Sequence, residues 1–189
     1  MTDRTLPTLQ TSRLILRPFS LADAQAVQQL AGDRAVAAST LSIPHPYPDG
    51  LATAWIRTHP EQFSTGKALT WAIVLADNRL CGSIGLGLVP EFHLAELGYW
   101  VGVPFWGQGY CTEAAQRVID YGFQELGLNR IQGTHYTDNP ASGRVMAKLD
   151  MAYEGCRRQH TYKDGVFKDV KLYGLLRQDW ASTPAPDQP

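Results

Sequence analysis

The chain has 189 residues, of which 44% are hydrophobic and 19% are charged, and its 17 basic and 18 acidic residues leave a net charge of −1. This composition indicates one folded domain with a real core and argues against a disordered chain. The balanced charge argues against partners such as nucleic acid or a membrane surface that bind a strongly basic field. Three cysteines, Cys81, Cys111 and Cys156, predict a reducing cytoplasmic location and no disulfide framework.

The first part of the chain is expected to alternate between short strands, helices and a loop. Ser20 is a typical first residue for a helix, and Gly32 is a typical end. Three prolines and one glycine between residues 44 and 50 predict a loop, because proline lacks a backbone N–H donor. In chain order we expect a flexible segment over residues 1–10, a strand at 14–16, a helix over 20–32, a loop over 42–50 and a helix over 51–63.

The second part is expected to be richer in strands. Pro104 cannot donate to a sheet and predicts the end of the third strand, and apolar residues at three- and four-residue spacing predict the long helix that follows. We expect strands over 69–75, 80–89, 94–103 and 131–137, helices over 107–126 and 139–149, two last strands over 152–161 and 166–176, and a disordered tail over 181–189. The pattern predicts a single α+β domain over residues 11–180.

Two glycines, Gly107 and Gly109, stand where a predicted strand gives way to the long helix. Such a turn directs unpaired N–H groups to one place at the positive end of the helix dipole, which suits a phosphate or pyrophosphate. The ATP-binding P-loop does not fit, since no Lys-Ser/Thr pair follows, and the dinucleotide fingerprint lacks its third glycine. A plain strand-to-helix turn is the alternative.

The order of several motifs resembles the GNAT superfamily of acetyl-CoA-dependent N-acetyltransferases, and within it the Rim-type branch that acetylates N-terminal amines of ribosomal proteins. The resemblance runs from about Thr11 to Trp180. It rests on Thr11-Ser12-Arg13-Leu14-Ile15-Leu16-Arg17, Glu96-Leu97-Gly98-Tyr99-Trp100, Trp106-Gly107-Gln108-Gly109 with Thr112-Glu113-Ala114, Asn129-Arg130-Ile131, Asn139 with Ser142, Lys148-Leu149, Glu154-Gly155, Asp164-Gly165 and Asp169. It implies a twisted, mostly antiparallel sheet of about seven strands, splayed in the middle and flanked by about four helices.

The resemblance also implies a binding site for acetyl-CoA as co-substrate, with no metal. Backbone groups from Gly107 to Thr112 would hold the pyrophosphate, and the pantetheine arm would add to the strand at Val101 and Val103. Ser142 would protonate the leaving thiolate, whereas the tyrosine that serves other members is replaced by Met146. The full cofactor-binding set is Val101, Val103, Trp106, Gly107, Gln108, Gly109, Tyr110, Cys111, Thr112, Asn139 and Ser142.

Glu96 is the candidate general base, with a merely paired strand carboxylate as the alternative. His93 and His135 are weaker candidates. Glu113 lies in the first helical turn, where a carboxylate suits the helix dipole, and we give it no catalytic role. Cys111 at the helix start permits a covalent acetyl-cysteine route, although members of the family usually transfer directly.

The sequence therefore predicts direct acetyl transfer to a primary amine, with a protein or peptide N-terminal α-amine as the favoured acceptor. A small-molecule amine, such as an amino acid, polyamine or antibiotic, is the second hypothesis. The third is a catalytically idle acyl-CoA-binding module, which departures from the family pattern at Cys111, Asp150 and Met151 leave open. The acceptor, the acyl-chain preference and the choice between monomer and homodimer stay undetermined.

Overall fold

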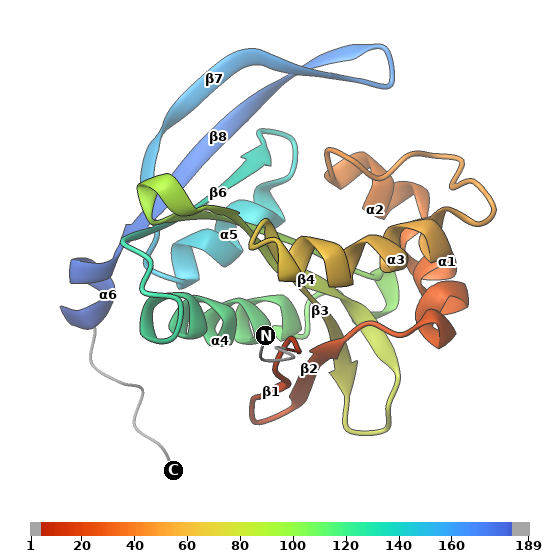
Figure 1. Cartoon of the computed structure of the whole chain (residues 1–189). Coiled ribbons are helices and arrows are strands. Elements are labelled where there is room, and N and C mark those ends of the chain that lie inside the picture. The colour runs from red at the N-terminus through yellow and green to blue at the C-terminus, as the bar shows by residue number, and fades with distance from the viewer. Residues whose placement is uncertain (1–4, 183–189) are drawn as a thin grey trace.

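The computed structural model describes residues 5–182, which form a mixed α/β structure around one large sheet (Figure 1). Within these residues the sheet has eight strands in the order β1-β2-β3-β4-β5-β6-β8-β7. All neighbours are antiparallel except β5 and β6. The strands are β1 (Leu9–Gln10), β2 (Leu14–Pro18), β3 (Ala68–Leu75), β4 (Leu80–Val89), β5 (Leu94–Val101), β6 (Arg130–Tyr136), β7 (Ala152–Lys163) and β8 (Val166–Leu176).

The sheet opens in its middle between β5 and β6. Residues 94–96 of β5 pair with residues 130–132 of β6, and no pairing follows although β5 continues to Val101 and β6 to Tyr136. The free edges of the two strands therefore diverge over most of their length. This opening confirms the splayed, mostly antiparallel sheet that the resemblance implied.

Helices cover both faces of the sheet. The side chains of β3 alternate between two cores: Trp71 and Ile73 pack in the core that contains the apolar face of α4, whereas Ala72 and Val74 pack against α1 and α3. The alternation is the two-residue period of a strand buried on both sides. The helices are α1 (Ala24–Ala31), α2 (Arg34–Ser39), α3 (Leu51–Ser64), α4 (Tyr110–Gln124), α5 (Pro140–Lys148) and α6 (Arg177–Ser182).

The four expected helices correspond to α1, α3, α4 and α5, while β1, α2 and α6 were not expected. Leu9 is 4% exposed and pairs with Leu16, so that a buried side chain orders a strand too short for any periodicity. The expected strand over 94–103 ends at Val101, because Val103–Phe105 form a 3-10 turn in which the Gly102 carbonyl accepts the Phe105 N–H. Residues 1–4 and 183–189, where part of both expected flexible ends falls, lie outside the described residues.

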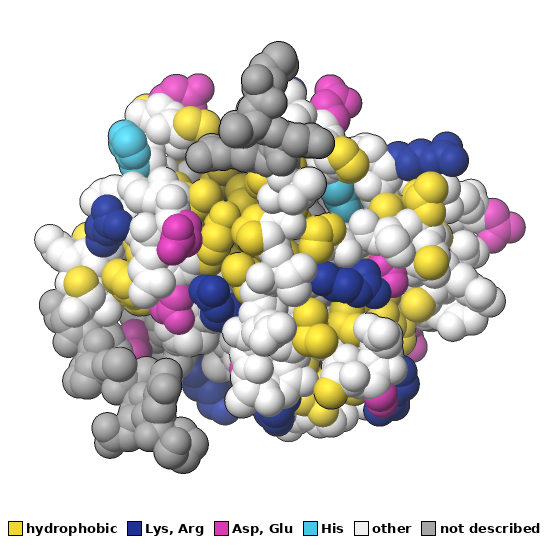
Figure 2. Space-filling view, turned by 60° about the horizontal axis from the view of Figure 1, so that its bottom comes forward, with side chains coloured by type: hydrophobic (Ala, Val, Ile, Leu, Met, Phe, Trp, Pro, Cys, Tyr) yellow, Lys and Arg dark blue, Asp and Glu magenta, His cyan; other side chains and the backbone are white. Residues whose placement is uncertain are grey.

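Three further observations concern the surface charge, membrane-spanning helices and the state of the cysteines. Figure 2 shows basic and acidic side chains interspersed over one face of the molecule. Among residues 5–182, no helix is long and apolar enough to cross a membrane. Cys81, Cys111 and Cys156 are all free thiols.

Candidate active site

A cavity of about 1180 Å³ lies at the opening between β5 and β6. Its wall includes residues 96–101 of β5, residues 134–136 of β6, the glycine loop at the start of α4, and the first turns of α5. Residues 39–44 and Tyr47 line it from the side of α1 and α3. The cavity thus joins the glycine loop to a loop on the other side of the sheet, and two molecules can meet within it.

The glycine loop has the geometry that the sequence predicted. Gly107 and Gly109 have φ of +75° and +79°, a region that favours glycine, and a Cβ at Gly107 would meet nothing within 4 Å. Gly109 precedes α4, and Glu113 donates its N–H to the Gly109 carbonyl. The N–H groups of the preceding residues have no partner within the helix, so this turn fits a pyrophosphate.

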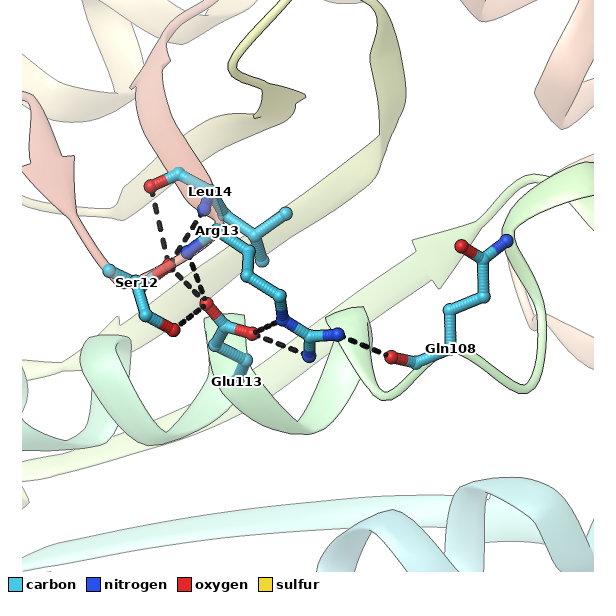
Figure 3. A network of polar contacts seen from close by, with 6 residues as sticks. Ser12, Arg13, Leu14, Gln108 and Glu113 are labelled. Atoms are coloured by element: carbon cyan, nitrogen blue, oxygen red, sulfur yellow. Dashed lines mark hydrogen bonds and ion pairs between the residues drawn. The ribbon is translucent and has the colours of Figure 1, made fainter. Parts of the chain in front are cut away.

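A polar network holds this loop against the start of β2 (Figure 3). One oxygen of the Glu113 carboxylate accepts hydrogen bonds from Thr11 Oγ1 (2.6 Å), Ser12 Oγ (3.0 Å) and the Arg13 N–H (2.9 Å). The other oxygen pairs with the Arg13 guanidinium at 2.6 Å. Burial alone would raise the pKa of Glu113, but these hydrogen bonds lower it below its ordinary value.

Arg13 carries the network on to the glycine loop. Its Nη1 donates to the carbonyl of Gln108 at 3.0 Å, and its guanidinium lies 4.9 Å from the centre of the Tyr110 ring. Glu113 therefore has a structural task, as expected, and Arg13 is a loop-fixing residue that sequence reasoning missed. The signal was present, since the Thr11-Ser12-Arg13 motif and Glu113 occur together in the resemblance.

The backbone of β5 presents hydrogen-bonding groups to the cavity. Because Gly102 bonds to β4, the alternation of a strand turns the N–H and carbonyl of Val101 toward the opening. Trp106, 47% exposed, donates its indole N–H to the Val101 carbonyl at 2.6 Å. The Val101 carbonyl oxygen keeps a second lone pair, and the Val101 N–H can donate a hydrogen bond to an extended ligand.

Two of the predicted cofactor residues do not line the cavity. Val103 lies in the 3-10 turn after β5, with its carbonyl accepting the Trp106 N–H. The side chain of Gln108 points to the Pro104 carbonyl. The remaining members of the set all contribute to the cavity wall: Val101, Trp106, Gly107, Gly109, Tyr110, Cys111, Thr112, Asn139 and Ser142.

The start of α5 brings Asn139 and Ser142 together. Asn139 Oδ1 accepts the Ser142 N–H at 3.3 Å and so caps the helix, and Asn139 Nδ2 donates to the carbonyl of Ser39 at 3.3 Å. Ser142 is 9% exposed, and its Oγ lies 2.7 Å from the hydroxyl of Tyr99. Tyr99 comes from β5, and the sequence analysis gave it no role.

Cys111 is a poor nucleophile in this setting. Burial raises the pKa of its thiol to about 12, so that the thiolate is scarce at neutral pH despite the nearby helix start. This disfavours the covalent acetyl-cysteine route and leaves Cys111 as a packing residue beside the glycine loop.

Glu96 lies on the other side of the sheet from α5. Thr134 Oγ1 donates to its carboxylate at 3.3 Å, and both side chains line the cavity. Tyr136 shares this face with Thr134, because residues two apart in a strand point the same way. Tyr136 is 4% exposed, and its hydroxyl has no hydrogen-bond partner, as is true of the nearby Thr161 hydroxyl.

The two histidines fit a base less well than Glu96. His93 is exposed in the turn before β5 and does not line the cavity. His135 is buried and lines it, with Nδ1 bonded to the Tyr136 carbonyl at 2.7 Å. Its Nε2 has no partner and faces Gly143 of α5, away from the side on which Glu96 and Thr134 meet.

The sheet, its central opening and the glycine turn define the class of acyl-CoA-dependent acyltransferases. Comparison with known families makes this specific: residues 13–152 match the acetyltransferase (GNAT) domain. The chain belongs to the GNAT family of acetyl-CoA-dependent N-acetyltransferases. Among residues 5–182 no group of three or more His, Cys, Asp or Glu side chains is placed to hold a metal.

Individual relatives extend the comparison. An uncharacterized N-acetyltransferase of Bacillus subtilis, YoaA, is 31% identical over 173 residues, which are 90% of this chain and 97% of that protein. The ribosomal-protein-serine acetyltransferase of Escherichia coli is 30% identical over 105 residues, 55% of this chain and 59% of that protein. The structure of a ribosomal-protein α-N-acetyltransferase in complex with coenzyme A has a TM-score of 0.84 at 21% identity and covers 92% of this chain and 99% of that one, which shows a shared fold.

Proposed function

We propose that this protein transfers the acetyl group of acetyl-CoA directly to the N-terminal α-amine of a protein or peptide. The observation that carries the proposal is the cavity itself, which connects the glycine loop to Glu96 on the opposite side of the sheet. Acetyl-CoA would enter from the glycine loop and the amine from the side of Glu96. Ribosomal-protein acetyltransferases among the relatives support a protein acceptor.

Each candidate residue has a task that its position permits. An ammonium has no lone pair, so Glu96 would accept a proton from the incoming amine, whose ordinary pKa is near 8. Ser142, on the other wall, would give its proton to the departing thiolate. The N–H groups of the glycine loop and of Val101 would fix the acetyl-CoA, and none of these steps needs a metal or a covalent enzyme intermediate.

A small-molecule acceptor is the second candidate, because a spermidine N-acetyltransferase structure shares the fold with a TM-score of 0.78 at 19% identity. The charges of this cavity weigh against a polyamine. Glu96 is the one carboxylate among its described lining residues, beside three cationic side chains, Arg144, Lys148 and Arg157. A polyamine would bring several ammonium groups to a wall that offers one acid, whereas a peptide N-terminus brings one.

We place this reaction in the reducing cytoplasm, as the odd number of cysteines in the sequence predicts.

The test is an acetylation assay with serine- and alanine-initiated peptides, the same peptides blocked at the N-terminus but carrying an internal lysine, and spermidine. We expect transfer to the free peptides only. Transfer to spermidine alone would replace the proposal with the small-molecule hypothesis, and micromolar acetyl-CoA binding without any transfer would favour the idle module. In the same assay Ser142→Ala should lower kcat about 10²-fold or more with little change in acetyl-CoA affinity.

A further inference from the structure

The hydroxyls of Tyr99 and Ser142 form a hydrogen bond between strand β5 and helix α5. Their oxygens lie 2.7 Å apart, although the residues are 43 positions apart in sequence and come from β5 and α5. Both residues line the cavity. The pair therefore lies in the wall of the cavity in which, on the proposed function, acetyl-CoA meets the amine.

The chemistry at Ser142 has a requirement that this residue cannot meet alone. A thiol has an ordinary pKa near 8.5, and a serine hydroxyl is a far weaker acid. Proton transfer from Ser142 to a thiolate is consequently uphill unless the serine oxygen gains another proton as it loses its own.

Tyr99 is placed to supply that proton. A serine hydroxyl has one hydrogen, so Ser142 can point it into the cavity only if its oxygen is the acceptor in the bond with Tyr99. The alternative acceptor, the Ser142 carbonyl, lies farther from the Tyr99 hydroxyl, at 3.3 Å. Burial, helped by the nearby Cys111, raises the pKa of Tyr99 and keeps it a donor across the physiological pH range.

We propose that Tyr99 is the positioning residue of Ser142. Tyr99 donates a hydrogen bond to Ser142 Oγ and so directs the serine proton toward the thioester sulfur. As the serine proton leaves, Tyr99 gives its own proton to the serine oxygen. The inference rests on the proposed role of Ser142. As the carbon–sulfur bond breaks, the Ser142 proton moves to sulfur and the Tyr99 proton moves to Ser142. The amine gives one proton to Glu96, which releases it to solvent, and solvent returns one proton to Tyr99, so that the net change is one proton from amine to thiol.

Kinetics of Tyr99→Phe provide the first test. The variant keeps the ring and removes the hydroxyl, so we expect kcat to fall at least about 10-fold while the KM for acetyl-CoA stays within about twofold. Because both residues act through one proton chain, Tyr99→Phe/Ser142→Ala should be no slower than Ser142→Ala alone. Tyr173→Phe, on β8 and outside the cavity wall, is the matched control and should keep full activity.

Binding of the product provides a second test that does not depend on turnover. If Tyr99 and Ser142 stabilise the sulfur anion, wild-type affinity for free CoA rises between about pH 7 and 9.5, as the thiol ionises. Tyr99→Phe should lose that rise and keep its affinity for acetyl-CoA. Calorimetric titrations with CoA and acetyl-CoA at several pH values measure both, and Tyr99→Met takes the place of Tyr99→Phe if the latter does not fold.

Three results would overturn the proposal: unchanged kcat in Tyr99→Phe, additive losses in the double variant, or an unchanged pH dependence of CoA binding. The assays follow release of free thiol with whichever amine the wild type accepts. If the wild type rejects every peptide, the proposed acceptor is wrong while the Tyr99 test proceeds with a small amine and with CoA binding.

Discussion

Glu113→Ala is expected to destabilise the fold and loosen the glycine loop without touching the reacting groups. The Glu113 carboxylate is 16% exposed and receives three hydrogen bonds and the Arg13 guanidinium (Figure 3). Only the hydrogen bond from Thr11 is partly buried, and such a bond to a charged group contributes about 1.5–3 kcal/mol. The exposed contacts of Ser12 and Arg13 together contribute at most about 1 kcal/mol. We therefore expect a loss of about 2–3 kcal/mol, which corresponds to a fall in Tm of about 5–10 °C for a domain of this size.

Thermal and urea unfolding measure that loss, with Glu125→Ala as the control because Glu125 is an exposed glutamate beside the same helix. The dissociation constant of acetyl-CoA should rise as well, since Arg13 no longer fixes the Gln108 carbonyl. The pH dependence of the unfolding free energy tests the direction of this contribution. The folded pKa of Glu113 is lowered, so its contribution is present above the unfolded pKa and is lost as pH falls through the folded value. A loss below about 0.5 kcal/mol, equal to that of a surface residue, would refute the argument.

Three further substitutions test other parts of the structure. Gly109→Val places a β-branched side chain at φ +79° and should raise the dissociation constant of acetyl-CoA, measured by calorimetry, at least about 10-fold. An unaltered dissociation constant would show that this loop does not bind the pyrophosphate. Burial lowers the pKa of His59 to about 4 from an ordinary 6.5. As the pH drops from about 6.5 to about 4, the unfolded chain takes up the proton first, and wild-type stability should fall by about 1 kcal/mol, a value reduced because the ring is only partly buried. His59→Phe should lose this slope in urea unfolding. Lys163 donates to the carbonyls of Thr40 (2.7 Å) and Ile43 (2.6 Å), so Lys163→Met should raise the KM of the acceptor while the KM of acetyl-CoA stays constant.

Local patterns in the sequence were sufficient for most of the fold. Proline and glycine positions, the two-residue period of the strands and the helix spacing after Gly109 placed four helices and seven strands close to their observed bounds. The strand β1 was missed because two residues carry no period, and its order comes from the burial of Leu9 in the core. The end of β5 was placed two residues too late, since Pro104 marks the 3-10 turn and the strand stops before it.

The candidate site likewise has one part that the local sequence predicts and another that only the folded structure reveals. The glycine loop is a local structure of a few residues, and its backbone geometry follows from Gly107 and Gly109 alone. The bond between Tyr99 and Ser142 depends on how far β5 and β6 diverge and on where α5 begins, and neither is encoded in a local pattern. Arg13 likewise acquires its task only when β2 is brought against α4.

The opening of the sheet explains why catalysis can be built from such distant residues. A paired strand uses its N–H and carbonyl groups within the sheet, but beyond Glu96 of β5 and Gln132 of β6 the facing edges of the two strands are not paired with each other and can bind a ligand. The same divergence lets a side chain from either strand reach the cavity, so that Glu96 and Thr134 meet on one side while Tyr99 reaches Ser142 of α5. A proton acceptor and a proton donor consequently lie on different walls of one cavity. If β5 and β6 paired beyond Glu96 and Gln132, the sheet would use these backbone groups itself and the edge that binds the ligand would be lost, so the function depends on where this pairing ends.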